Sequence, residues 1–248
     1  DTNNKINIIM DNFNNQYVQT RPVTEEQTNE MVRRFMLSVY NWMTLGLGLT
    51  AVAAFGIGRS SLVNVILANP MLFWGIIIVQ FAVVLGMSFL MKKINSFVAV
   101  GLFFVYSLLT GVTFSTLFLV YTESSIFLTF FTCAAMFAGT SVFGYITKID
   151  LSRFGGFLMM GLIGIIIASV VNIFIGSSAI YWLTSYAGVL VFVGLTAWDT
   201  QKIKNMGMFM DSNSEDGRKA SIFGALMLYL DFINLFLFLL RIMGGRRD

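Results

Sequence analysis

The chain has 248 residues, of which 56% are hydrophobic and 12% charged, and its formal net charge is +3. Soluble domains carry about 25% charged residues, so this composition indicates an integral membrane protein built as one bundle without a separate soluble domain. The apolar runs are continuous, which excludes the alternating pattern of a membrane β-barrel. The complete lack of histidine excludes histidine catalysis and histidine metal ligation, and the small net charge gives no reason to expect a nucleic-acid partner.

The N-terminal segment is polar. Residues 1–30 are rich in Asn, Gln and Thr, and we expect them to form a mobile tail. Thr24 and Gln27 have the spacing of a capping box, in which a hydroxyl and an amide side chain satisfy the first free backbone groups of a helix. A helix is therefore expected to begin at about this point and to continue into the membrane.

Seven long apolar runs follow the tail. They cover residues 35–57, 71–91, 97–120, 126–146, 154–175, 180–201 and 222–241. A helix needs about 20 apolar residues to cross the hydrocarbon of a bilayer, because each residue adds about 1.5 Å. The runs predict an all-α integral membrane protein, with a seven-helix bundle over residues 31–243 and a short basic tail at residues 244–248.

Basic residues are divided unevenly between the two sides of this bundle. One side, formed by the N-terminal segment and the connections after the second, fourth and sixth runs, holds Lys5, Arg21, Arg33, Arg34, Lys92, Lys93, Lys148, Arg153, Lys202, Lys204, Arg218 and Lys219. The other side holds Arg59, Arg241, Arg246 and Arg247. Twelve against four predicts a cytoplasmic N-terminus and an external C-terminus. The basic C-terminal segment fits that orientation poorly, so an even number of crossings with a re-entrant last segment stays open.

Small residues recur four positions apart within the runs. Examples are Ala135 with Gly139, Thr140 with Gly144, and Gly164 with Ala168. This spacing lets helix backbones approach closely, so it predicts bundle packing in the first place, with a glycine gate as the less favoured interpretation.

Two acidic residues lie inside consecutive apolar runs. Asp231 is near the middle of the last run, and Asp199 is near the end of the run before it. An Asp at the centre of a membrane helix costs about 2.5–3.5 kcal/mol on insertion scales, so each acid needs a partner or a function. Consecutive antiparallel helices are usually neighbours, and two close carboxylates in a low-dielectric site would share a proton. Such a pair could bind a cation when deprotonated and lock the bundle when protonated.

Other polar residues offer a structural alternative for Asp231 and a possible partner for Asp199. Tyr229 or Asn234 on the same run could satisfy Asp231 inside the bundle. Lys92 and Lys93 end the second run on the predicted cytoplasmic side, where a lysine could pair with Asp199 and close a path. Anchoring of the helix end at the lipid headgroups is the simpler interpretation of these lysines.

Two segments carry a family resemblance. Ala197-Trp-Asp-Thr-Gln-Lys-Ile203 and Leu228-Tyr-Leu-Asp-Phe-Ile-Asn-Leu-Phe236 resemble motifs of the transmembrane Bax inhibitor motif family, and the layout of seven runs is similar over residues 30–243. The resemblance is to a bacterial-type member. It implies a seven-helix fold whose last helix is central and wrapped by the other six, and a location in the bacterial inner membrane.

The resemblance also implies a proton-sensitive calcium leak through the bundle. Its di-aspartyl sensor falls on Asp199 and Asp231, which would also be the calcium ligands. In a bacterial relative's pattern, an Arg at the cytoplasmic end of the second helix latches onto the Asp of the sixth; that position is Lys92 here, which keeps the charge but loses the bidentate fork. Bacterial members are further linked to regulation of a membrane-anchored protease, and animal members to suppression of cell death.

The favoured prediction is a pH-sensitive calcium leak channel that is not an enzyme and holds no cofactor, with the bilayer, calcium and protons as its partners. A non-conducting regulator that binds a membrane protease through the polar tail is the alternative. An intramembrane aspartyl protease is remote, because the Gly-x-Gly that precedes the second Asp of such enzymes and their later Pro-Ala-Leu motif are both missing. A proton-coupled transporter lacks the inverted repeat or broken helix that would support it.

Overall fold

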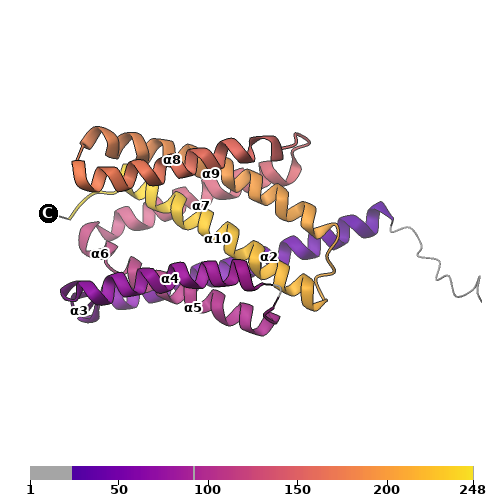
Figure 1. Ribbon diagram of the computed structural model, residues 1–248, viewed down its shortest axis with the longest axis horizontal. Helices are drawn as coiled ribbons and strands as arrows, with labels where there is room; N and C mark the ends of the chain where they lie inside the picture. The colour runs from indigo at the N-terminus through magenta and orange to yellow at the C-terminus, as the bar shows by residue number, and fades with distance from the viewer. Residues whose placement is uncertain (1–23, 92, 248) are drawn as a thin grey trace, which may run out of the picture.

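A computed structural model describes residues 24–91 and 93–247. Its helices are α2 (Glu25–Gly58), α3 (Leu62–Ala68), α4 (Pro70–Leu90), α5 (Ser96–Phe114), α6 (Leu117–Val120), α7 (Glu123–Ile146), α8 (Ser152–Ile175), α9 (Ser178–Gly207) and α10 (Glu215–Met243). Within these residues, 7 helical segments are long and apolar enough to cross a membrane. The prediction of an all-α membrane bundle with seven crossing helices is confirmed (Figure 1).

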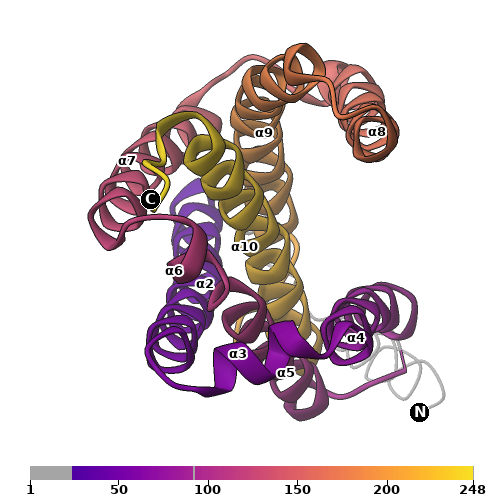
Figure 2. The same ribbon diagram turned by 90° about the vertical axis from the view of Figure 1, so that its left-hand side faces the viewer.

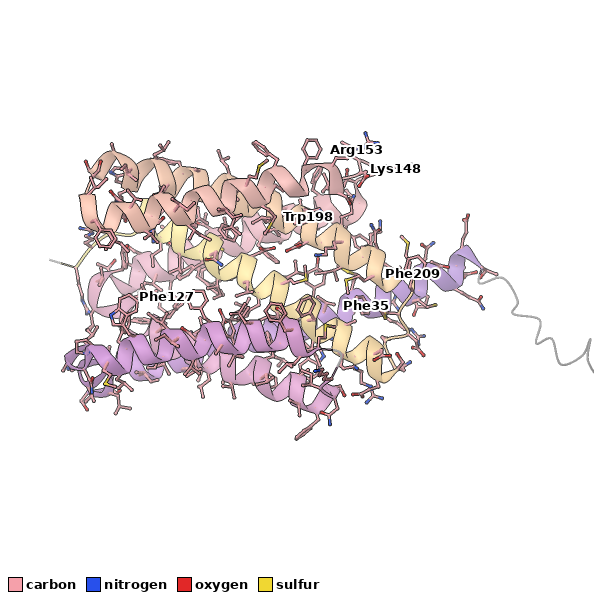
Figure 3. All side chains as sticks on the ribbon, viewed as in Figure 1. Phe35, Phe127, Lys148, Arg153, Trp198 and Phe209 are labelled. Carbon is pink, nitrogen blue, oxygen red and sulfur yellow. The ribbon has the colours of Figure 1, made fainter. Side chains whose placement is uncertain are left out.

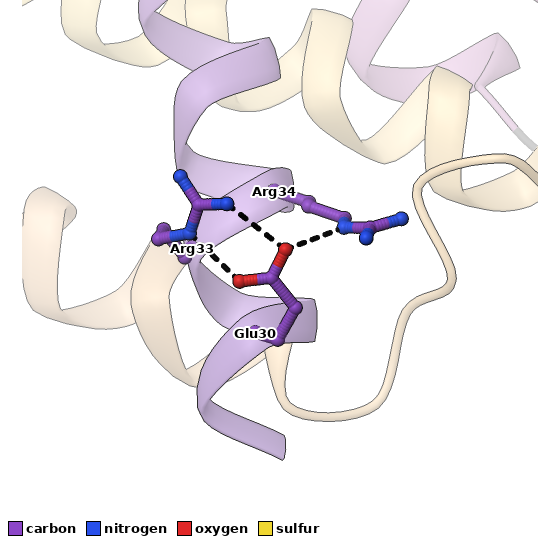
Figure 4. Close-up of polar contacts among 3 residues, drawn as sticks. All are labelled: Glu30, Arg33 and Arg34. Atoms are coloured by element: carbon purple, nitrogen blue, oxygen red, sulfur yellow. Dashed lines mark hydrogen bonds and ion pairs between the residues drawn. The ribbon is translucent and has the colours of Figure 1, made fainter. Parts of the chain in front are cut away.

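The first helix begins at the predicted capping box. The Thr24 hydroxyl accepts a hydrogen bond from the Gln27 backbone N–H at 3.2 Å, and the Gln27 side chain accepts one from the Thr24 N–H at 3.1 Å. One turn later, Glu30 accepts hydrogen bonds from Arg33 and Arg34, both at 2.7 Å (Figure 4). These contacts explain why residues 25–30 are helical, so the predicted tail was too long at this end; residues 1–23 lie outside the described part.

The last helix forms the centre of the bundle, as expected. In its most apolar window 72% of the residues are buried, against 6% in the windows of α4 and α8. Helices α2, α5, α7 and α9 pack directly against α10, whereas α4 packs on α5 and α8 packs on α9 (Figure 2). The expectation that all six other helices would wrap α10 was therefore wrong. Helices α2, α5, α7 and α9 cover α10, and α4 and α8 face the lipid from a second layer.

The structure divides two regions differently from the apolar runs. The run over residues 97–120 is broken into α5 and α6, because Ser115 and Thr116 donate hydrogen bonds back to the carbonyls of Val112 and Thr113. Such bonds compete with the regular helical ladder. Ahead of Pro70, the short helix α3 forms where no element was expected.

The C-terminal segment crosses the bundle without interruption. Helix α10 is one continuous helix of 29 residues, so the re-entrant alternative is contradicted. The segment beyond it, residues 245–247, pairs with the end of α6 and the connection that follows: Thr122 N–H donates to Gly245 O at 3.0 Å, and Arg247 N–H donates to Val120 O at 2.9 Å. This antiparallel bridge gives the basic tail a place on the protein itself.

The connections of the bundle separate its two ends. The start of α2 and the connections α4–α5, α7–α8 and α9–α10 lie at one end, which we call the loop end; this is the end that the basic residues predict to be cytoplasmic (Figure 1). Lys148, Arg153 and Phe209 mark it in Figure 3, and Phe127 lies in the other half of the bundle. The loop end therefore collects the segments that the distribution of basic residues assigned to one side.

Candidate functional site

Asp199 on α9 and Asp231 on α10 meet inside the bundle. Their side chains lie within hydrogen-bonding range of each other, and the two residues are only 9% and 5% exposed. Within the described residues, the Oδ2 atom of Asp231 has no hydrogen-bond donor. Two ionised carboxylates can only accept, so a contact between them is favourable when one carries a proton and donates it to the other. Two carboxyl groups so placed could share one proton.

The path of the chain brings the two acids together. Helices α9 and α10 are antiparallel and are joined by residues 208–214, a tight connection in which the Ser214 hydroxyl accepts the Gly217 N–H at 3.0 Å. A Cβ atom at Gly217 would overlap the carbonyl group of Asp211, so only glycine fits at this place. The short connection makes the helices neighbours along their length.

In the part of the chain that the structure describes, the charge of Lys202 also acts on Asp199, and the Lys202 Nζ lies 5.3 Å from the centre of the Trp198 ring. For Asp231, the charged neighbour is Asp199 itself. Lys92, the predicted latch residue, lies outside the described residues, so a bond between it and Asp199 stays a prediction.

Tyr229 and Asn234 point to other partners. The Tyr229 hydroxyl lies 2.6 Å from the Thr50 hydroxyl of α2, and its ring is fully buried against Phe103 and Tyr106 of α5. The Asn234 side chain donates to the carbonyl of Leu230 at 2.8 Å. The structure thus brings the two aspartates together and gives these two residues separate hydrogen bonds.

Polar residues that follow Asp199 on α9 tie this helix to α7. The Thr200 hydroxyl lies 3.2 Å from the Ser141 hydroxyl, and the Lys204 Nζ donates to the Tyr145 carbonyl at 2.7 Å. Sequence reasoning did not single out these contacts. The sequence signal for a close contact between α7 and α9 was the small residue Gly144. In the structure, a Cβ at Gly144 would overlap the backbone carbonyl of Ala197 on α9.

A crevice opens between α2 and α7. It encloses about 560 Å³, with α10 as its floor, and is lined by Arg33, Met36, Leu37, Tyr40, Met43, Thr44, Ala134, Phe137, Ala138, Ser141, Val142, Tyr145 and Phe232. Ser141 is one of its lining residues, and the Ser141 hydroxyl contacts Thr200, the residue after Asp199. Phe137 and Phe232 lie edge to face at the inner wall, with ring centres 5.5 Å apart.

The pair by itself is a poor resident metal site. Residues 24–91 and 93–247 contain no group of three or more Cys, Asp or Glu residues placed to hold a metal ion. Calcium takes 6–8 oxygen ligands, and two carboxyl groups supply at most four. Calcium at this position would keep water ligands, as suits an ion in transit.

These features define a multi-pass helical membrane protein whose central helix carries one half of a buried carboxyl pair. The chain belongs to the family described as inhibitor of apoptosis-promoting Bax1, whose model matches residues 32–248.

Several relatives are bacterial proteins. The inner membrane protein YbhL of Escherichia coli is 50% identical over 218 residues, which cover 87% of this chain and 93% of that protein. Uncharacterized proteins of Rickettsia prowazekii and Borreliella burgdorferi are 45% identical over 239 residues and 42% identical over 228 residues. These matches cover 94% and 91% of this chain, and 99% and 98% of the respective relatives. The predicted family is confirmed.

Proposed function

We propose that the protein is a pH-sensitive cation leak pathway, with calcium as the cation, and that Asp199 and Asp231 form its gate. The observation that carries the proposal is the contact of the two buried carboxyl groups between α9 and α10. The choice of calcium follows the family resemblance and the affinity of oxygen ligands for this ion.

Protonation of the pair favours the closed bundle. With one proton, the two carboxyl groups hold α9 and α10 together through a hydrogen bond between charged and neutral partners. Without it, two negative charges in contact repel each other strongly in a low-dielectric interior. The separated carboxylates then attract Ca²⁺, so we expect flux to rise as the pH rises.

The α2–α7 crevice is the natural approach to the gate from the loop end. Its lining includes hydroxyl groups of Tyr40, Thr44, Ser141 and Tyr145, which can solvate a partly hydrated ion. Phe137 and Phe232 form an apolar barrier at the inner wall of the crevice. Apolar constrictions close water-filled paths by dewetting, which complements a charged gate.

The test is calcium flux into liposomes that hold the purified protein, measured across a pH series. The wild-type protein should show pH-dependent flux, and Asp199→Asn and Asp231→Asn should each flatten this dependence, because a pair with one titratable carboxyl cannot change between the shared-proton and doubly charged states.

Asp216→Asn provides the matched control. Asp216 lies on α10 with its side chain 80% exposed and paired with Lys219, so the same chemical change there should leave the pH profile intact. An unchanged pH profile in both Asp199→Asn and Asp231→Asn would refute gating by the pair. Absence of calcium flux at every pH would refute the leak itself and favour a non-conducting regulator.

A further inference from the structure

One side chain ties the α7–α8 connection to α9. The Gln201 Nε2 donates to the carbonyl of Ile149 at 2.8 Å, and its Oε1 accepts from the Leu151 N–H at 2.8 Å. Gln201 is 8% exposed, and Leu151, the residue before the first turn of α8, makes no side-chain capping hydrogen bond. Gln201 therefore supplies both hydrogen bonds that this stretch of backbone receives from α9.

Gln201 and Asp199 lie on opposite sides of the same helical turn. Successive residues of an α-helix are about 100° apart, so positions separated by two point about 200° apart. The Asp199 side faces α10, where Asp231 lies, and the Gln201 side faces the α7–α8 connection. A packed helix moves as a stiff unit, so a displacement on one side of this turn is transmitted to the other.

Neighbouring contacts strengthen this transmission. Thr200 and Lys204 bind α7 within the same stretch of α9, through Ser141 and the Tyr145 carbonyl. The ring of Trp198 leaves no room for a Cβ at Gly155 of α8. The stretch that carries Asp199 is thus held to α7, to α8 and to their connection, and it reaches α10 through the carboxyl pair.

We propose that Gln201 is a positioning residue that couples the α7–α8 connection to the carboxyl pair. This proposal rests on the proposed function, because the carboxyl pair that Gln201 positions is the proposed gate. The connection is exposed at the loop end and carries charged side chains, among them Asp150 with 60% exposure. A ligand or protein that shifts this connection would also shift Asp199 relative to Asp231. Binding at the connection would therefore regulate the gate.

The flux test compares Gln201→Met with Gln80→Met in the liposome assay. Methionine keeps the length and volume of glutamine but removes both hydrogen bonds. Gln80 of α4 is a matched control, because its amide donates to Thr110 at 3.1 Å and accepts from Thr113 at 3.3 Å, on a helix that does not pack on α9. Gln201→Met should change the ratio of flux at high and low pH about 2- to 30-fold, the range seen for residues that transmit coupling, and Gln80→Met should leave the ratio unchanged.

A second measurement does not depend on flux. Hydrogen–deuterium exchange of the peptide that contains residues 147–152 is compared at one pH between wild type and Asp231→Asn, each with and without Gln201→Met. Asp231→Asn should alter this exchange when Gln201 is present, and it should have no effect in the Gln201→Met background, where the tether is missing. If exchange of the connection ignores Asp231→Asn in both backgrounds, or responds equally in both, the coupling is refuted. A wild-type protein without calcium flux would refute only the proposed leak, and the exchange result would then decide the coupling.

Discussion

At the scale of single residues, the partners available to each buried polar group distinguish structural residues from candidates for function. Asp231 and Tyr229 are two positions apart on α10 and point to opposite sides of it. The Tyr229 hydroxyl hydrogen-bonds with the Thr50 hydroxyl, which also contacts the carbonyls of Gly46 and Ser107. Among the described residues, the partner of the Asp231 carboxyl group is the carboxyl group of Asp199. A buried acid whose partner is another acid is costly, so its presence indicates a function.

Tyr229→Phe should destabilise the bundle without affecting the gate. Loss of one buried hydroxyl bond costs about 0.5–1.5 kcal/mol of unfolding free energy, and Thr50 keeps its carbonyl partners. Thermal unfolding in detergent should show the loss, while Tyr186→Phe, at an exposed position, should show none. The pH profile of calcium flux should match wild type in both. A shifted profile in Tyr229→Phe would mean that Tyr229 acts on the carboxyl pair.

At the scale of helices, close backbone contact is confined to particular glycines. Of the three small-residue spacings named above, the structure uses the glycine of one at a helix crossing. A Cβ at Gly144 would overlap the Ala197 carbonyl, whereas a Cβ at Gly139 or Gly164 would meet open space. The crossing of α7 and α9 at Gly144 sets the height of the turn that carries Asp199. Packing at this one glycine thus positions the site.

Gly144→Ala and Gly139→Ala separate packing from helix propensity on the same helix. Overpacking at a close helix crossing costs about 1–3 kcal/mol, so Gly144→Ala should lower the unfolding temperature. Gly139→Ala should be neutral or stabilising by up to about 1 kcal/mol, because alanine favours the helix and nothing obstructs its methyl group. Thermal unfolding of the two purified variants is the measurement. Equal losses in both would show that α7 and α9 do not cross as described.

At the scale of the whole molecule, basic residues at both ends of the bundle are held by contacts with the protein, as Arg34 and Lys204 show at the loop end. Opposite the loop end, arginines are engaged by the protein. Arg59 pairs with Glu123 at 2.7 Å, Arg247 donates to the Phe118 carbonyl at 2.8 Å, and Arg241 lies 5.2 Å from the centre of the Phe238 ring. These contacts hold the arginines at that end of the bundle. The basic C-terminal segment is therefore compatible with the predicted orientation, in which the loop end is cytoplasmic.

Reporter fusions test this orientation. A reporter placed after Lys148 or Met210 should report a cytoplasmic position, and one placed after Glu123 should report an external position, because positively charged loops are retained in the cytoplasm. Enzymatic activity of paired cytoplasmic and external reporters in intact cells is the measurement. An external signal at Met210 would reverse the orientation of the bundle while leaving its fold unchanged.

The sequence by itself determined the number and order of the crossing helices, the start of α2 at its capping box, and the two acids as the residues to examine. Long apolar runs and an isolated charge within them are properties of local composition, which no tertiary contact has to supply.

Only the tertiary structure decided which side of each helix meets which neighbour. Membrane helices that are apolar all round have no polar face to indicate their rotation, so the sequence left Tyr229, Asn234 and Asp199 all as candidates to partner Asp231. The same ambiguity hid the two-sided role of the turn at Asp199 and Gln201, and the second layer formed by α4 and α8. Helix rotation follows from close packing between neighbours, and this packing became visible only in the assembled bundle.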